Sequence, residues 1–346
     1  MRHRHKMNRA DRPAASRTLA TLPALLVLLS MLAACTSAPA TAEVEEDIRV
    51  ELVEWARLAQ NAHNFQPWRV VLDPDNERRM TVFVDDSRLL PETDPPARQV
   101  TISVGAFLAV IDARAAQLGW DAEVELFPEG EYALDTIGSI PVATMRLKRS
   151  TNTESELAVA AAPDAISQAT VKYRYKPASL DAETISAVEA YSTPGIDFSV
   201  ITDPAEVAWL NELSTEAFTL EMRHEPTLQE TFAATRQNGA ARREKPWGLA
   251  YTANFPARTL WAVDAFSTIA PQGPAGWAET GIGMFESSIE NINTYVAVVT
   301  DDNSRSTQVK TGMLLQAAWM ELHQAGHVVL PNSQALQEYP AMAELY

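Results

Sequence analysis

A short segment near the start of the chain combines side chains that could bind a flat heteroaromatic ligand. His63, Asn64 and Gln66 supply an imidazole and two amides, and Pro67 and Trp68 follow directly. The segment falls between a predicted helix and a predicted strand, so we expect a turn that exposes backbone amides beside these side chains. The same residues could equally form a structural turn, in which Asn64 caps the chain and Trp68 enters the core.

The elements around this turn predict a first α+β half over residues 44–150. Apolar residues recur at helical spacing over 44–60, and two strands are expected at 68–72 and 80–84. Asp73-Pro74-Asp75-Asn76 has strong turn chemistry, which predicts a hairpin. A long helix over 97–118 ends at Gly119, and strands at 123–127 and 142–147 complete the half.

A second half is expected over residues 151–346. Its expected helices lie near 164–170, at 182–191, across 206–237 and at 307–325, and its expected strands lie at 196–201 and 295–299. The stretch 238–256 is expected to be irregular. Residues 271–283 are rich in glycine and proline, which predicts a loop.

The two halves share a weak internal repeat. Val82 to Arg88 places an acidic turn after a strand, and Val298 to Arg305 does the same. The helices that follow carry Gly105 and Gly119 in the first half and Gly312 and Gly326 in the second, 14 residues apart in both. Chance similarity could explain the helices alone, but the conserved order of the parts favours duplication. We therefore predict a single-chain pseudo-dimer of mixed sheets flanked by helices.

The turn motif also resembles a known family. Ala59 to Val70, with His-Asn-x-Gln-Pro-Trp, is similar to the Pro-Ser-x-x-Asn-x-Gln-Pro-Trp motif of the nitroreductase superfamily. The histidine before the asparagine resembles the single-chain, internally duplicated Acg-like branch. Arg98 to Leu108 and Thr300 to Gln334 extend that resemblance.

The resemblance implies that FMN binds between the halves and carries hydride from NAD(P)H to nitro compounds, quinones or similar small acceptors. No catalytic side chain is required. His63, Asn64 and Gln66 would contact the flavin, Thr170, Lys172 and Arg174 its phosphate, and Asn332, Ser333 and Gln334 the isoalloxazine ring. Ala169 stands where the family usually has arginine, and the family's final strand is not found after residue 334. These departures leave a non-catalytic flavin-binding or flavin-storage protein as the alternative.

The first residues resemble a bacterial lipoprotein signal. Residues 1–34 join a basic region to a short apolar run, and Leu32-Ala33-Ala34-Cys35 is similar to a lipobox. We expect cleavage before Cys35, lipidation of its thiol, a tether over 35–43 and a lipid-anchored protein of the cell envelope. The alternative is a secretory signal with an incidental cysteine.

The net charge and the remaining candidate metal ligands limit which partners we expect. The chain carries a formal net charge of -17, and the expected signal is itself basic, so the mature protein is more acidic still. So acidic a surface argues against nucleic acid or anionic lipid headgroups as partners. His323 and His327 lack matched acidic ligands, so no metal site is predicted. We expect a monomeric pseudo-dimer.

Overall fold

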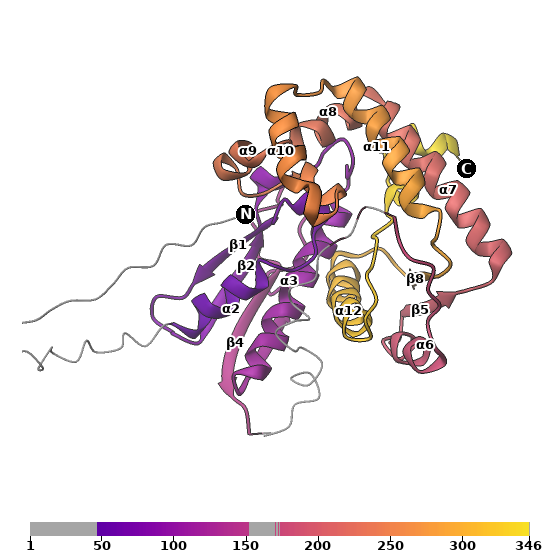
Figure 1. The fold of residues 1–346 in the computed structure, drawn as a ribbon. Helices are drawn as coiled ribbons and strands as arrows, with labels where there is room; N and C mark the ends of the chain where they lie inside the picture. The colour runs from indigo at the N-terminus through magenta and orange to yellow at the C-terminus, as the bar shows by residue number, and fades with distance from the viewer. Residues whose placement is uncertain (1–46, 152–169, 171, 173, 346) are drawn as a thin grey trace, which may run out of the picture. The chain divides into compact units, whose positions relative to one another are not determined.

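The computed structural model describes residues 47–151, 170, 172 and 174–345, which form an α+β fold as predicted (Figure 1). Cys35, Ala169 and most of the helix expected near 164–170 lie outside the described residues. The elements of the first half are α2 (Ile48–Ala56), η1 (Ala62–Asn64), β1 (Trp68–Leu72), β2 (Arg79–Val84), η2 (Asp86–Arg88), α3 (Arg98–Gln117), β3 (Trp120–Leu126) and β4 (Ala143–Arg149).

The first half is an antiparallel sheet covered by α3. The strand order is β1-β2-β4-β3, and β1 and β2 form the predicted hairpin with Trp68 opposite Val84. Alternate residues Met80, Val82 and Val84 are buried against α3, as the period of a half-buried strand requires. By length and composition α3 could cross a membrane, but two thirds of its apolar stretch is buried in this core.

The second half contains a smaller sheet and a group of helices over residues 204–289, which we call the helical arm. Its elements are α6 (Ala182–Glu189), β5 (Ile196–Ile201), α7 (Pro204–Arg223), α8 (Glu225–Ala234), β6 (Thr235–Arg236), α9 (Gly239–Glu244), β7 (Leu249–Ala250), η3 (Tyr251–Asn254), η4 (Ala257–Thr259), α10 (Leu260–Ile269), α11 (Pro274–Ile289), β8 (Tyr295–Thr300), α12 (Arg305–Gln324), η5 (Gln334–Leu336) and η6 (Met342–Leu345). Strands β5 and β8 pair antiparallel beside α6 and α12, whereas β6 and β7 form a short parallel pair.

The expected loop over 271–283 is wrong, because most of it belongs to α11. Pro274 occupies the first turn of this helix, where no backbone donor is needed. Trp277, Ile282 and Phe285 are buried against α7 and α8, and this packing outweighs the glycine content. The irregular stretch expected over 238–256 is interrupted by α9, and α10 was not predicted.

Helices α3 and α12 cross at the two glycines of the repeat. A Cβ atom on Gly105 would lie 2.1 Å from the carbonyl oxygen of Val309, and one on Gly312 would lie 2.0 Å from that of Ile102. Each glycine therefore meets the residue three positions before the other glycine. This reciprocity is that of an isologous contact, which a duplicated chain requires, although the duplication itself stays a prediction.

Substitution at this crossing is expected to separate the helices. Gly105→Ala should reduce the free energy of unfolding by about 3 kcal/mol or more, because the added methyl group meets rigid backbone. Urea denaturation measures the loss. Gly283→Ala is the matched control, since nothing lies within 4 Å of its Cβ position on α11. That variant should be neutral or slightly stabilised. Equal stability of the Gly105 and Gly283 variants would contradict the close crossing.

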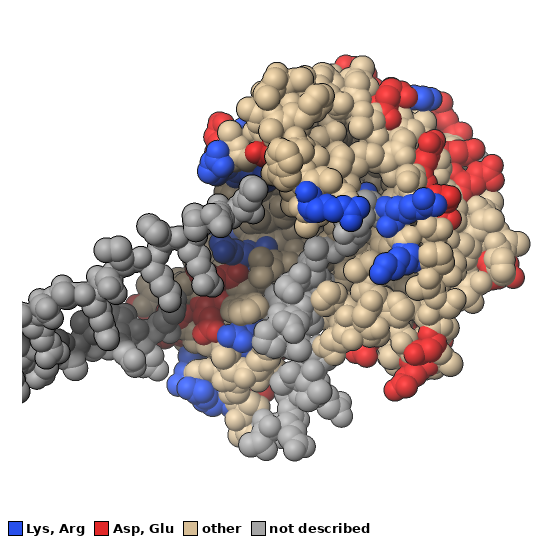
Figure 2. Space-filling model, viewed as in Figure 1, with Lys and Arg blue, Asp and Glu red and all other residues tan. Residues whose placement is uncertain are grey.

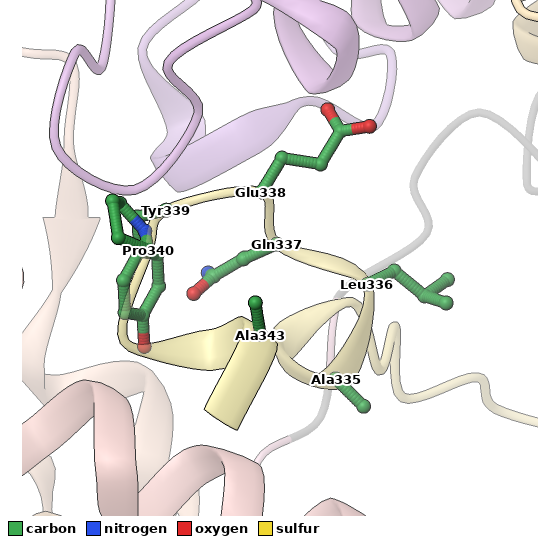
Figure 3. Close-up of a pocket in the computed structure, with 7 residues that line it drawn as sticks. All are labelled: Ala335, Leu336, Gln337, Glu338, Tyr339, Pro340 and Ala343. Carbon is green, nitrogen blue, oxygen red and sulfur yellow. The ribbon is translucent and has the colours of Figure 1, made fainter. Parts of the chain in front are cut away.

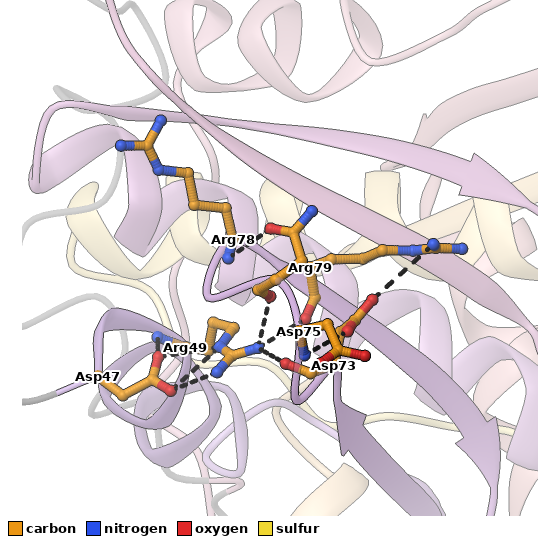
Figure 4. Close-up of polar contacts among 7 residues, drawn as sticks. Asp47, Arg49, Asp73, Asp75, Arg78 and Arg79 are labelled. Carbon is orange, nitrogen blue, oxygen red and sulfur yellow. Dashed lines mark hydrogen bonds and ion pairs between the residues drawn. The ribbon is translucent and has the colours of Figure 1, made fainter.

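A buried arginine fixes the hairpin to the start of α2 (Figure 4). The Arg49 side chain is 6% exposed and pairs with Asp47 at 2.6 Å. Its Nη1 atom also lies within 2.9 Å of the carbonyl oxygens of Asp73, Asn76 and Arg79 around the hairpin turn. The hydrogen bond from Arg49 lowers the pKa of Asp47, and burial opposes this shift. One guanidinium thus gathers three carbonyls of the turn, two of which, on Asn76 and Arg79, also accept backbone hydrogen bonds within the hairpin.

Lysine is not expected to replace this guanidinium. Arg49→Lys should lose about 2 kcal/mol of unfolding free energy, because an ammonium cannot reach Asp47 and the three carbonyls together. Thermal denaturation checks this. Arg57→Lys, at the exposed end of the same helix, is the control and should leave the melting temperature unchanged. An equal effect of both substitutions would show that the contacts of Arg49 contribute nothing specific.

Candidate functional site

The turn that contains His63 has a strained backbone. His63 and Asn64 have φ of 52°, and Gln66 has φ of 50°. Non-glycine residues rarely adopt this left-handed region, and each such residue costs of order 1 kcal/mol. Three left-handed residues within four positions persist only where the surrounding structure imposes this backbone conformation. Strain of this kind is concentrated at ligand-binding sites.

Helices from both halves hold the turn in place. Asn61 accepts a hydrogen bond at 2.8 Å from the backbone of Gln66, which closes the turn on itself. The Ala62 N–H donates to Ser103 on α3 at 3.0 Å. The Gln60 N–H donates to Gln316 on α12, also at 3.0 Å. The crossing helices therefore position the turn directly.

A hydrogen-bonded chain runs from the turn into the helical arm. His63 Nε2 lies 3.2 Å from Thr231 Oγ1 on α8, and Thr231 donates to Glu221 on α7 at 3.3 Å. The other carboxylate oxygen of Glu221 accepts from Gln337 at 3.0 Å. Because the single proton of Thr231 is directed to the carboxylate, His63 must donate from Nε2. Its Nδ1 atom is then a hydrogen-bond acceptor.

Burial controls the charges along this chain. Glu221 is 2% exposed, and burial raises its pKa, although hydrogen bonds from Gln337 and Thr231 and the charge of Lys172 favour ionisation. Burial also lowers the pKa of Lys172, which Glu221 partly opposes. His63 is half-buried among these groups. This burial, together with Lys172, lowers the pKa of His63 to about 3, so His63 is neutral near pH 7.

The loop after α12 brings unpaired polar atoms to the same region. Asn332 donates to Ser214 on α7, and Ser333 donates to Gln99 on α3 at 3.1 Å. Within the described residues, the amide oxygens of Asn332, Gln334 and Gln337 are buried without a hydrogen-bond donor. Buried acceptors without donors are rare in folded proteins, so three along one loop indicate a place for a ligand that donates hydrogen bonds.

An open pocket of about 570 Å³ adjoins this loop (Figure 3). It is lined by Ala335, Leu336, Gln337, Glu338, Tyr339, Pro340 and Ala343. Figure 3 shows the Gln337 side chain directed into the space between Tyr339 and Ala343, whereas Glu338 and Leu336 point away from it. Gln337 therefore links the pocket to Glu221.

The structure gathers some of the predicted site residues and separates others. Lys172 and Gln334 lie near Glu221, and His63 is linked to it through Thr231. Thr170 lies beside the turn through a 3.0 Å hydrogen bond to Gln60. Arg174 instead forms an exposed ion pair with Glu290 at 2.9 Å.

Asn64 also faces away from the gathered residues. It is exposed and binds Gly248 reciprocally, through its side chain at 3.1 Å and its carbonyl at 2.8 Å. Gln66 contributes the backbone N–H that closes the turn.

Sequence reasoning missed Glu221, Thr231 and Gln337. Glu221 lies on a predicted helix between Leu220 and Met222, where a glutamate normally faces solvent. Only the packing of α8 and the C-terminal segment buries it. No local pattern distinguishes it from the other glutamates of α7.

The neutral state of His63 should be visible in the pH dependence of stability. An unfolded histidine binds a proton with a pKa of about 6.5, whereas folded His63 does not until about pH 3, so stability is lost as the pH falls between these values. His63→Gln should remove up to about 1.4 kcal/mol of this loss per pH unit. Urea denaturation at several pH values measures it, with His323→Gln as the control. Superimposable profiles for wild type and His63→Gln would refute the assignment.

Comparisons with known proteins give distant and partial matches. No family model matches the chain. Over 72 residues it is 36% identical to the uncharacterized protein Rv3127 of Mycobacterium tuberculosis, which covers 20% of this chain and 21% of that protein. Two further proteins of the same organism bear the names "Putative NAD(P)H nitroreductase acg" and "Putative NAD(P)H nitroreductase Rv3131". They are 33% identical over 85 residues and 34% identical over 99 residues.

These matches span only a part of each protein. They cover 25% of this chain and of the first nitroreductase, and 28% of this chain and of the second. The chain thus matches about a quarter of the length of these relatives. Distant similarity to proteins named as nitroreductases agrees with the observed α+β fold, and both support the resemblance found in the turn motif.

Proposed function

We propose that this chain is an FMN-dependent, nitroreductase-like oxidoreductase that uses NAD(P)H to reduce nitro compounds, quinones or similar small acceptors. The observation that carries the proposal is the set of donor-less amide oxygens on Asn332, Gln334 and Gln337, close to the strained turn. A flavin offers the complementary groups, an imide N–H and ribityl hydroxyls. The residues present therefore fit the polar edge of a flavin.

The chemistry of transfer belongs to FMN, which accepts and releases hydride when it is bound. The side chains would bind and orient it. Neutral His63 offers Nδ1 as an acceptor, and Gln334 and Asn332 offer amide oxygens. Thr170 and Lys172 supply a hydroxyl and a cation for the phosphate. Arg174 could join them at small cost, because an exposed ion pair such as Arg174–Glu290 contributes only about 0–1 kcal/mol.

The proposal includes the organisation and location of the protein. Residues of both halves surround Glu221, which supports a single-chain pseudo-dimer with one flavin site between its halves. The lipobox-like sequence supports export and lipidation of Cys35 at the extracytoplasmic face of the envelope. The partners would be a small-molecule electron acceptor and, through the lipid, the membrane.

One observation favours a second function. Lys172 is half-buried and feels the charge of Glu221, and Arg174 is paired with Glu290, so a carboxylate already acts on each basic side chain before any phosphate binds. With alanine at 169, the phosphate would be held weakly. A non-catalytic flavin-binding or flavin-storage protein of the envelope would keep the fold under these conditions.

Titration with FMN separates these functions. Purified protein should quench flavin fluorescence at a stoichiometry of one, and Gln334→Leu should weaken binding about tenfold because a buried acceptor is lost. Gln229→Leu, exposed on α8, should bind like wild type. Oxidation of NADH or NADPH with a soluble quinone then identifies the enzyme. Flavin binding without oxidation selects the storage protein, and no flavin binding after reconstitution refutes both.

A further inference from the structure

Helix α10 exposes most of its apolar residues. Two of its polar residues, Asp264 and Ser267, face the protein, whereas Thr268 is exposed. Asp264 accepts hydrogen bonds from the Gly239 N–H at 2.5 Å and from Arg242 at 3.2 Å, and Ser267 is buried. These contacts fix the orientation of the helix on α9. Leu260 and Val263 are half-buried, and the other apolar residues of the helix are left on the outer side.

The outer side of α10 is a continuous apolar face. Trp261 is 77% exposed, Phe266 64% and Ile269 84%. Ala262 and Ala265 are exposed between them. At 100° per residue these five residues fall on one side of the helix. Isolated exposed apolar residues are ordinary, but a contiguous set that includes two aromatic rings marks an interaction surface.

Basic side chains are concentrated in the segment that contains α10, in an otherwise acidic protein. Residues 236–270 contain five basic side chains and two acidic ones, whereas the whole chain has a net charge of -17. Arg243 in α9, Lys245 directly after it and Arg258 in η4 are exposed. Figure 2 shows a largely uncharged surface above a border of basic side chains, with acidic side chains gathered on the flank over α7. Aromatic and basic residues together are typical of helices that lie at a membrane surface.

We propose that the outer face of α10 inserts into the surface of a bilayer with anionic headgroups. Trp261, Phe266 and Ile269 would enter the boundary between headgroups and acyl chains, while Arg243, Lys245 and Arg258 pair with lipid phosphates. The proposal does not require flavin or catalysis. It is supported by the expected lipid on Cys35, because residues 36–46 can span at most about 40 Å and would keep the fold near the membrane.

The charges favour a bilayer over a second copy of the chain. An isologous dimer through α10 would bring the Arg243, Lys245 and Arg258 side chains of both copies to one contact. Like charges so placed oppose association, whereas anionic lipid attracts them. Negative headgroups therefore complement both the charge and the apolar face.

A label on α10 tests the proposal in the full chain. Cys35 is the only cysteine, so Cys35→Ser removes both the lipid site and the competing thiol. Ala265→Cys in that background places an environment-sensitive fluorophore within the apolar face, and Ser139→Cys places it at an exposed control site in the first half. Vesicles of phosphatidylcholine with phosphatidylglycerol should shift the emission of the first label to the blue, and not that of the second.

Unlabelled variants identify the residues responsible. In vesicle sedimentation, Trp261→Ser should weaken partitioning about tenfold, and Arg243→Glu with Lys245→Glu should remove the preference for phosphatidylglycerol. Trp209→Ser is the matched control, because Trp209 is 60% exposed but lies alone on acidic α7. The proposal is overturned if the emission of the label at residue 265 does not shift with vesicles of phosphatidylcholine and phosphatidylglycerol. A concentration-dependent dimer in sedimentation velocity that Trp261→Ser abolishes would also overturn it.

Discussion

The close crossing of α3 and α12 is the contact on which the site depends. Gly105 and Gly312 allow the two backbones to approach to a distance that no side chain would permit. Ser103 and Gln99 on α3, and Gln316 on α12, are thereby brought to opposite sides of the same region. A helix pair at ordinary separation would move Gln316 away from the backbone of Gln60, with which it forms a hydrogen bond.

The site combines several features that each cost stability. The left-handed residues of the turn cost backbone energy, and the amide oxygens of the loop after α12 are buried without donors. Burial shifts the pKa values of three ionisable groups in the direction that disfavours their charged forms, those of Glu221, Lys172 and His63. Such features are tolerated where they serve binding or chemistry, and a ligand with matching donors would relieve part of the cost.

The turn is also joined to the arm that carries α10. Asn64 and Gly248 exchange two hydrogen bonds, and Arg88 donates to the Phe65 carbonyl at 2.9 Å while its guanidinium lies 3.8 Å above the ring of Trp247. Gly248 has φ of 99°, and a Cβ there would lie 2.3 Å from a carbonyl oxygen. The segment that links α9 to α10 is therefore fixed against the turn. The proposed flavin site and the proposed lipid surface share this connection.

The sequence by itself determined the elements whose signals are local. The hairpin follows from alternating residues and from the turn at Asp73 to Asn76, and the long helix ended by Gly119 follows from periodicity and a left-handed glycine. The motif around His63 predicts where a ligand would bind. The repeat also drew attention to Gly105 and Gly312, which meet at the helix crossing.

Tertiary structure decided the features that depend on contacts between distant segments. Whether Glu221 faces water or a buried threonine depends on the packing of α8 and of residues 334–340, and no local pattern contains that information. Pro274 and the glycines of α11 indicate a loop until Trp277 and Ile282 have a surface to cover. The orientation of α10 was likewise set by Asp264 binding α9, because its composition alone would place an apolar helix in the core.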